Sequence, residues 1–185
     1  MNKIALLGAA AALFAVPAAA NAQAYVQAQT GLDSVSIDGG SSEGLTYGVA
    51  AGYDFPVREA LFFGIQASVS DSTTKECARD VIALGDKLCV RAGRDLAAVA
   101  RIGTNVGETS KLYVLGGYTN ARLRVTYTDG TNKDSDGTNL DGFRLGAGFE
   151  HNFGGNLFGK VEYNYSNYEQ GFSRHYGLAG LGVKF

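Results

Sequence analysis

The sequence predicts an all-β fold, an eight-stranded antiparallel up-and-down transmembrane β-barrel preceded by a cleaved signal peptide. Two observations predict it. Apolar residues recur at every second position in most segments, and the polar connections alternate between short and long. The 26 Gly, 10 Tyr and 10 Phe, against only 2 Pro, suit many strands joined by tight turns.

The chain begins with a segment that does not belong to the folded body. Lys3 gives a positive start, residues 4–16 are apolar and uncharged, and Ala20 and Ala22 are small residues suitably placed for cleavage after Ala22. The predicted organisation is a signal peptide at residues 1–22 and one barrel domain at residues 23–185. A cut after Ala24 fits almost as well. A retained anchor is disfavoured because the apolar run is short for a bilayer.

Eight segments after the signal peptide have the period-two pattern of strands. They are residues 24–33, 45–55, 61–70, 94–103, 111–127, 141–151, 160–166 and 174–185. The segment 111–127 contains one strand, and Gly116 and Gly117 blur the alternation within it. Between them, short connections are predicted near 56–60, 104–110 and 152–156, and long polar ones near 33–44, 71–92, 128–140 and 167–173. Short turns at one end and long loops at the other are typical of outer-membrane barrels.

The two faces of these strands favour a membrane barrel over a soluble one. One face carries Val, Leu, Ile, Phe and Tyr, and the other is rich in Gly and Ala with scattered charges. Because an eight-stranded lumen is filled by side chains, we expect the second face to point inward and the apolar face to meet lipid. The predicted lumen charge network consists of Arg101, Arg144, Glu150, Lys160, Glu162 and Lys184. A soluble β-barrel or sandwich is the alternative.

The last third of the chain carries a resemblance to a known family. Phe185 ends the chain, with Val183 and Leu181 alternating behind it. Together with residues 143–150 and 161–165, this strand resembles the opacity-protein-like family of outer-membrane β-barrel surface antigens. The resemblance implies an eight-stranded barrel with variable surface loops and a structural, adhesin or surface-antigen role. The aromatic end similarly resembles the C-terminal signal that the barrel-assembly machinery recognises.

The two cysteines predict a disulfide rather than a metal site. Cys77 and Cys89 lie in the longest predicted loop, and an exported chain reaches a compartment that permits disulfides. The only two His, His151 and His175, are far from them in sequence. Residues 132–137 resemble the start of a Ca²⁺ loop, but the acid expected near its end is missing. We therefore expect no metal.

The sequence contains no convincing catalytic or cofactor site. Ser173 and His175 are the only close Ser/His pair, and no acid is evident to orient the His. The Gly-rich segments open no helix, so no nucleotide loop and no cofactor are expected. The formal net charge of −2 argues against a nucleic-acid partner.

These observations predict a structural surface protein of the cell outer membrane, an antigen or adhesin with a filled lumen and exposed loops, and not an enzyme. The expected partners are outer-membrane lipids, the barrel-assembly machinery and an unidentified host or cell-surface ligand. We expect a monomer because a closed sheet needs no partner strand. A narrow porin-like channel for small solutes or ions is the alternative function, and a lipid-modifying enzyme is a third.

Overall fold

The computed structural model describes residues 23–37, 40–80, 84–129 and 132–185. These residues form the strands β1 (Gln23–Ile37), β2 (Gly40–Pro56), β3 (Leu61–Ser72), β4 (Lys75–Arg79), β5 (Asp86–Val106), β6 (Ser110–Asp129), β7 (Asn132–Gly154), β8 (Leu157–Tyr168) and β9 (Ser173–Lys184), and the 3-10 helix η2 (Glu169–Gly171). The predicted signal peptide lies outside the described residues, so its cleavage stays a prediction. Within the described ranges, no helix is long and apolar enough to cross a membrane.

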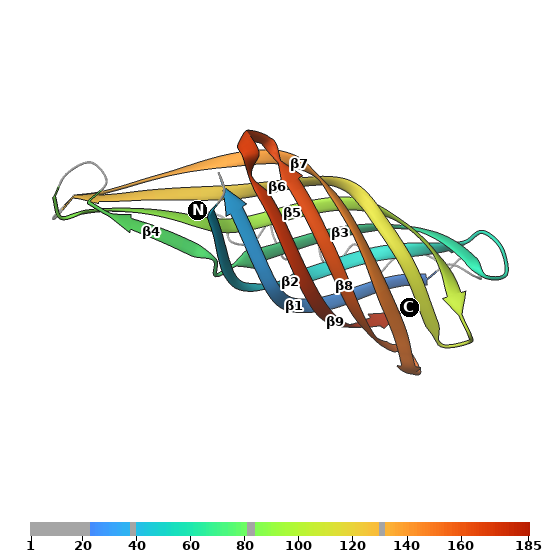
Figure 1. Ribbon diagram of the computed structural model, residues 1–185. Helices are drawn as coiled ribbons and strands as arrows, with labels where there is room; N and C mark the ends of the chain where they lie inside the picture. Colours follow the sequence, from blue (N-terminus) through green and yellow to red (C-terminus); the bar gives the residue numbers. More distant parts are fainter. Residues whose placement is uncertain (1–22, 38–39, 81–83, 130–131) are drawn as a thin grey trace, which may run out of the picture.

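Eight of the strands close into a ring (Figure 1). Neighbours pair antiparallel in the order β3-β2-β1-β9-β8-β7-β6-β5, and pairing between β3 and β5 closes the circle. β4 stands outside the ring and pairs with β5. A closed ring has no unpaired edge, which is the condition for a sheet in lipid. The predicted eight-stranded up-and-down barrel is confirmed.

Side-chain alternation gives the ring an apolar outside and a polar inside. In β5, Asp95, Val99 and Arg101 are buried, whereas Leu96 and Ile102 are 38% and 58% exposed. The same pattern runs through the other strands of the ring. Apolar side chains therefore point away from the barrel, as they must if lipid surrounds it.

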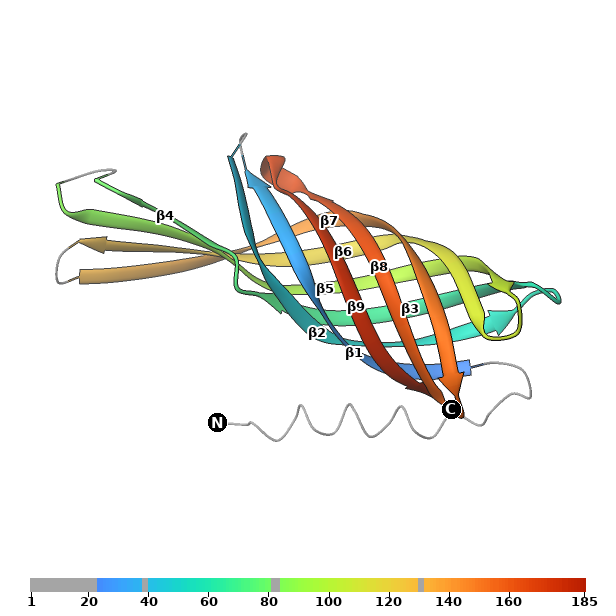
Figure 2. The same cartoon turned by 60° about the horizontal axis from the view of Figure 1, so that its bottom comes forward.

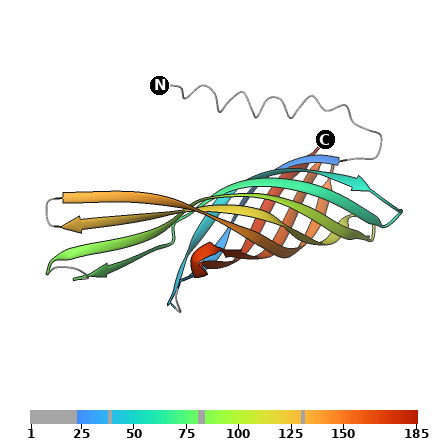
Figure 3. The same cartoon turned by 90° about the horizontal axis from the view of Figure 1, so that it is seen from above.

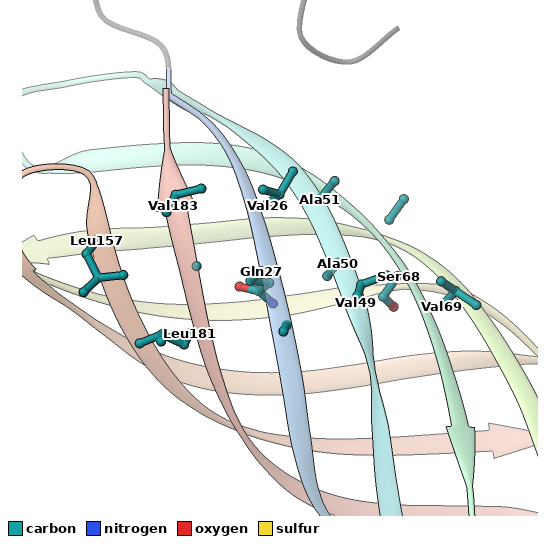
Figure 4. A pocket seen from close by; sticks show the side chains of 13 residues that line it. Val26, Gln27, Val49, Ala50, Ala51, Ser68, Val69, Leu157, Leu181 and Val183 are labelled. Carbon is teal, nitrogen blue, oxygen red and sulfur yellow. The ribbon is translucent and has the colours of Figure 1, made fainter. Parts of the chain in front are cut away.

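The outer wall contains a shallow hollow where small side chains interrupt larger ones (Figure 4). Val26, Val49 and Val69 border it, and Ala51 pairs with Ala67 across β2 and β3. All these outward side chains belong to the lipid-facing surface. Apart from Gln27 and Ser68 its lining residues are apolar or glycine, which makes the hollow suitable for contact with acyl chains.

Two of the predicted long loops are mostly strand. β1 stays paired with β2 as far as Ile37, and β6 stays paired with β7 as far as Asp129. The predicted loops at 33–44 and 128–140 were therefore wrong. Beyond the lipid both faces of a strand can be solvated, so the period-two pattern fades while the backbone pairing continues. The connection predicted at 167–173 holds η2.

The sheet extends far beyond the ring on one side (Figures 2 and 3). This extension, which we call the flap, consists of β4 and the adjoining ends of β5, β6 and β7, residues 75–79, 86–94, 122–129 and 132–139. The loop predicted at 71–92 is thus largely sheet. Cys77 and Cys89 face each other across β4 and β5 and form a disulfide. The predicted crosslink is confirmed, and it braces the flap rather than the ring.

Candidate functional site: the filled lumen

The inward side chains of the ring form two charged clusters. The turn-end cluster, near the short turns, consists of Asp54, Arg101, Lys111, Glu150, Lys160, Glu162 and Lys184. The hairpin-end cluster, near the long hairpins, consists of Asp33, Asp95, Arg144 and Arg174. Strand alternation places every one of these side chains on the inner face.

Arg101 is the centre of the turn-end cluster. Its guanidinium lies 3.2 Å from Glu150 Oε2 and 3.8 Å from Asp54 Oδ2, and it donates a hydrogen bond of 2.6 Å to Tyr25 Oη. The guanidinium carbon also lies 4.0 Å from the ring centroid of Tyr113. Pairing, hydrogen bonding and the aromatic face together offset the cost of burying this charge.

The lysines of this cluster are paired as well. Lys160 Nζ lies 2.8 Å from Glu162 Oε2, and the hydroxyl of Tyr113 donates to the same oxygen at 2.7 Å. Lys184 Nζ lies 2.7 Å from Glu150 Oε1. Each oxygen of Glu150 therefore lies beside a cation, Arg101 of β5 at one and Lys184 of β9 at the other, and these contacts join both strands to β7 through the lumen.

Asp95 organises the hairpin-end cluster. Its Oδ2 accepts hydrogen bonds from Arg144 at 2.7 Å, Arg174 at 3.2 Å and the hydroxyl of Tyr168 at 2.6 Å. Arg174 also lies 2.6 Å from Asp33 Oδ2. The two carboxylates and two guanidinia match in number, so this end of the lumen carries no excess charge.

Five aromatic side chains of the lumen each lie beside a glycine of the neighbouring strand. The pairs are Tyr25 with Gly52, Phe62 with Gly103, Tyr113 with Gly148, Phe158 with Gly182, and Tyr168 with Gly142. A Cβ on Gly148 would lie 2.5 Å from the ring of Tyr113. Glycine is therefore required for the ring to lie against the wall.

The structure places all six predicted lumen charges on the inner face, each at most 7% exposed. It separates Arg144 from the other five, because Arg144 belongs to the hairpin-end cluster. Five further members of the network were not predicted from the sequence: Asp33, Asp54, Asp95, Lys111 and Arg174. Each of them lies at or next to the end of a predicted strand. Extending the alternation in steps of two from the nearest inward residue would have placed each one on the inner face.

The predicted C-terminal signal residues lie on the lipid-facing surface. Leu181, Val183 and Phe185 are 56%, 38% and 55% exposed. The backbone N–H of Phe185 donates to the carbonyl of Ala24 at 2.9 Å, so the last residue joins the pairing of β9 with β1. Recognition of these residues by the assembly machinery stays a prediction.

The Ser/His pair lies on the outer wall, outside the two clusters. His175 Nδ1 is 2.8 Å from the hydroxyl of Tyr163, and its ring packs on Tyr165 with centroids 4.7 Å apart. Among the contacts found for the described residues, none joins this imidazole to Ser173 or to a carboxylate. The described ranges also contain no group of three or more metal-ligating side chains that could hold an ion.

A closed ring with an apolar outside and a charged, side-chain-filled inside defines an integral outer-membrane β-barrel protein. The family model for the outer membrane protein beta-barrel domain matches residues 5–185. The chain belongs to this family, and its location is the cell outer membrane. No curated protein matches the chain significantly.

Solved structures share the fold at low sequence identity. Ail of Yersinia pestis, solved in complex with the heparin analogue sucrose octasulfate, is 14% identical with a TM-score of 0.62, over 89% of this chain and 99% of Ail. Neisserial surface protein A is 18% identical with a TM-score of 0.58, over 88% and 97%. A major outer membrane protein of Thermus thermophilus is 14% identical with a TM-score of 0.60, over 89% and 99%. At these identities the likeness shows the fold alone.

Proposed function

We propose that this protein is a closed, non-conducting barrel that presents its flap at the cell surface in a structural, surface-antigen or adhesin-like role. Outer-membrane barrels keep short turns in the periplasm and long hairpins outside, so the flap is the external part. Its four paired strands and its disulfide support a fixed recognition surface. The ring needs no partner strand, so a monomer is the proposed state.

One observation carries the non-conducting lumen: the side chain of Arg101 has 0% of its surface exposed. A water-filled passage through the turn-end cluster would have to wet that guanidinium. Instead, the guanidinium is surrounded by the carboxylate of Glu150, the hydroxyl of Tyr25 and the ring of Tyr113. This favours the filled barrel over the narrow channel.

Planar-bilayer recording tests the closed lumen. We expect no steady open-channel current from the purified, folded protein. A double variant, Arg101→Ser with Tyr25→Ser, removes the centre of the plug and serves as the positive control, provided that it still shows the heat-dependent gel shift of a folded barrel. A stable single-channel current in the unaltered protein would contradict the proposal.

The orientation of the flap can be tested on intact cells. Leu84, at the tip of the β4–β5 hairpin, is 98% exposed. An epitope inserted after Leu84 should bind antibody on unbroken cells, whereas an epitope in the short turn at Glu59 should bind only after the cells are opened. The reverse pattern would overturn the proposed orientation.

We also propose that the protein is not an enzyme. Ser173 is partly buried and His175 is exposed. Among the contacts found for the described residues, no hydrogen bond joins the two and no carboxylate orients the imidazole, as a nucleophilic site would require. Mass spectra of lipid A should be identical in cells that produce the protein, its Ser173→Ala variant or neither. A new lipid A species that depends on Ser173 would refute this.

A further inference from the structure

The flap segregates its charges by face. Its residues comprise eight basic side chains, Lys75, Arg79, Lys87, Arg91, Arg94, Arg122, Arg124 and Lys133, and five acidic ones, Glu76, Asp86, Asp129, Asp134 and Asp136. Strand register shows that the basic residues share one face and the acidic residues the other. We call these the basic face and the acidic face.

The register of the four strands establishes this division. Residues paired across a sheet lie on the same face, and neighbours along a strand lie on opposite faces. Arg91 pairs with Arg124 and with Lys75, and Lys87, four residues from Arg91 on the same strand, pairs with Arg79. On β6, Arg122 is two residues from Arg124. Lys133 pairs with Thr128, which in turn pairs with Lys87. Arg94 is three residues from Arg91, but the register shift between Ala92 and Asp95 brings its side chain to the same face. The pairings for the acidic face are Asp86 with Asp129, Val90 with Glu76, Tyr127 with Asp134, and Val125 with Asp136.

The basic face continues the lipid-facing wall, and the acidic face continues the lumen wall. Ala92 and Leu123, on the acidic face, pack into the cluster of buried residues at the hairpin end of the lumen. Arg91 and Arg122 are their neighbours on the opposite face. The flap therefore turns its cations outward, toward the membrane that surrounds the barrel.

Ion pairing within the described part of the chain leaves the cations of the basic face unneutralised. Arg91, Arg94, Arg122 and Arg124 are exposed and line one hollow together with a single carboxylate, Asp71. None of the ion pairs found among the described residues involves any of the eight cations. Arg94 donates to the amide oxygen of Asn120 at 3.5 Å, which leaves its charge in place.

The basic face begins close to the last apolar residues of the lipid-facing surface. On β5, Arg94 comes two residues after the lipid-facing Leu96 in the direction of the flap, and on β6 Arg122 comes four residues after the exposed Tyr118. At about 3.3 Å per residue, the backbones of Arg94 and Arg122 lie roughly 7 and 13 Å along the strand from these two side chains. The tilt of the strands makes the height above the apolar band smaller, and long arginine side chains can reach back toward the polar layer of the leaflet.

We propose that the basic face of the flap binds the phosphorylated saccharide headgroups of lipopolysaccharide in the surrounding outer leaflet. Guanidinium groups recognise phosphate with charge-assisted hydrogen bonds, and several cations beside an anionic membrane surface act together. A face that rises from the lipid-facing wall meets this lipid before any soluble molecule. The inference rests on the proposed outward orientation of the flap, which the epitope experiment tests separately.

The test measures binding of lipid A to the folded protein in neutral detergent. The binding variant is Arg91→Ser, Arg94→Ser, Arg122→Ser and Arg124→Ser combined. Its matched control removes four charges from the other face: Glu76→Ser, Asp129→Ser, Asp134→Ser and Asp136→Ser. We expect salt-sensitive binding that falls on the order of a hundredfold in the binding variant and is retained in the control. Equal binding by the unaltered protein and the binding variant would overturn the proposal.

Two further arms identify the source of the anion. Enzymatically dephosphorylated lipid A should bind at least about tenfold more weakly, because the phosphates are the proposed contact. Binding of soluble heparin without binding of lipid A would also overturn the proposal, since the partner would then be a soluble polyanion.

If the fourfold variant fails to show a folded-barrel gel shift, the double variant Lys75→Ser, Arg79→Ser replaces it in the same binding measurement. β4 is outside the ring, and this pair should weaken binding severalfold; unchanged binding would refute the proposal.

Discussion

Nη1 of Arg101 donates a hydrogen bond to the hydroxyl of Tyr25 at 2.6 Å, across 76 residues of sequence. Tyr25 lies on β1 and Arg101 on β5, three strands apart around the ring. The contact therefore runs through the lumen and requires the intervening strands to be curved into place. The network fills the lumen, and it can form only when the ring has closed and brought β1 and β5 to opposite sides of the lumen.

Replacing Arg101 with Met should destabilise the barrel by about 3–5 kcal/mol, because Glu150 and Asp54 lose a buried cation. The measurement is urea unfolding in lipid vesicles, followed by the gel shift between folded and unfolded forms. Arg58→Met, in an exposed short turn, is the control and should change stability by less than about 0.5 kcal/mol. Similar effects at both positions would show that the buried pairing contributes little.

Adding a methyl group at Gly148 should destabilise the barrel, because the new Cβ would lie 2.5 Å from the ring of Tyr113. We expect Gly148→Ala to cost about 1–3 kcal/mol in the same unfolding assay. Gly177→Ala is the matched control, since a Cβ there meets nothing within 4 Å. In the background Tyr113→Ala the penalty at Gly148 should largely disappear, and a penalty that persists would exclude the ring as its cause.

A charge on the lipid-facing surface should be costly only within the apolar band. Leu145 and Asn139 share the outer face of β7, but Leu145 lies in the ring and Asn139 in the flap. Leu145→Arg should destabilise the protein in vesicles by roughly 2–4 kcal/mol, and Asn139→Arg by about 0–1 kcal/mol. Equal penalties at the two positions would contradict the placement of the membrane along β7.

Removing the disulfide should loosen the flap and leave the ring intact. Cys77 and Cys89 join β4 to β5 outside the ring, so the double variant Cys77→Ser, Cys89→Ser should keep the heat-dependent gel shift and its urea midpoint. Limited proteolysis and hydrogen exchange should then become faster in the β4–β5 hairpin. A lower midpoint for the whole barrel would show that flap and ring unfold together.

The alternation within the lipid band made much of the fold predictable. Leu96 and Ile102 against Asp95 and Arg101, for example, can be read directly from β5. The flap was not predictable in the same way, because Arg91, Lys87 and their neighbours look like a polar loop when lipid no longer marks one face as apolar. Only the register with β4 and β6 showed that their cations share one face.

The sequence by itself determined an exported, eight-stranded barrel, its lipid-facing and inward residues, and one disulfide, because these depend on local period-two alternation and on composition. Tertiary structure alone decided the division of the lumen charges into two clusters, the packing of five lumen aromatics against glycines, and the sorting of flap charges by face. These features depend on which residues of different strands stand opposite one another. That register is fixed by pairing around the whole ring and cannot be read from any one strand.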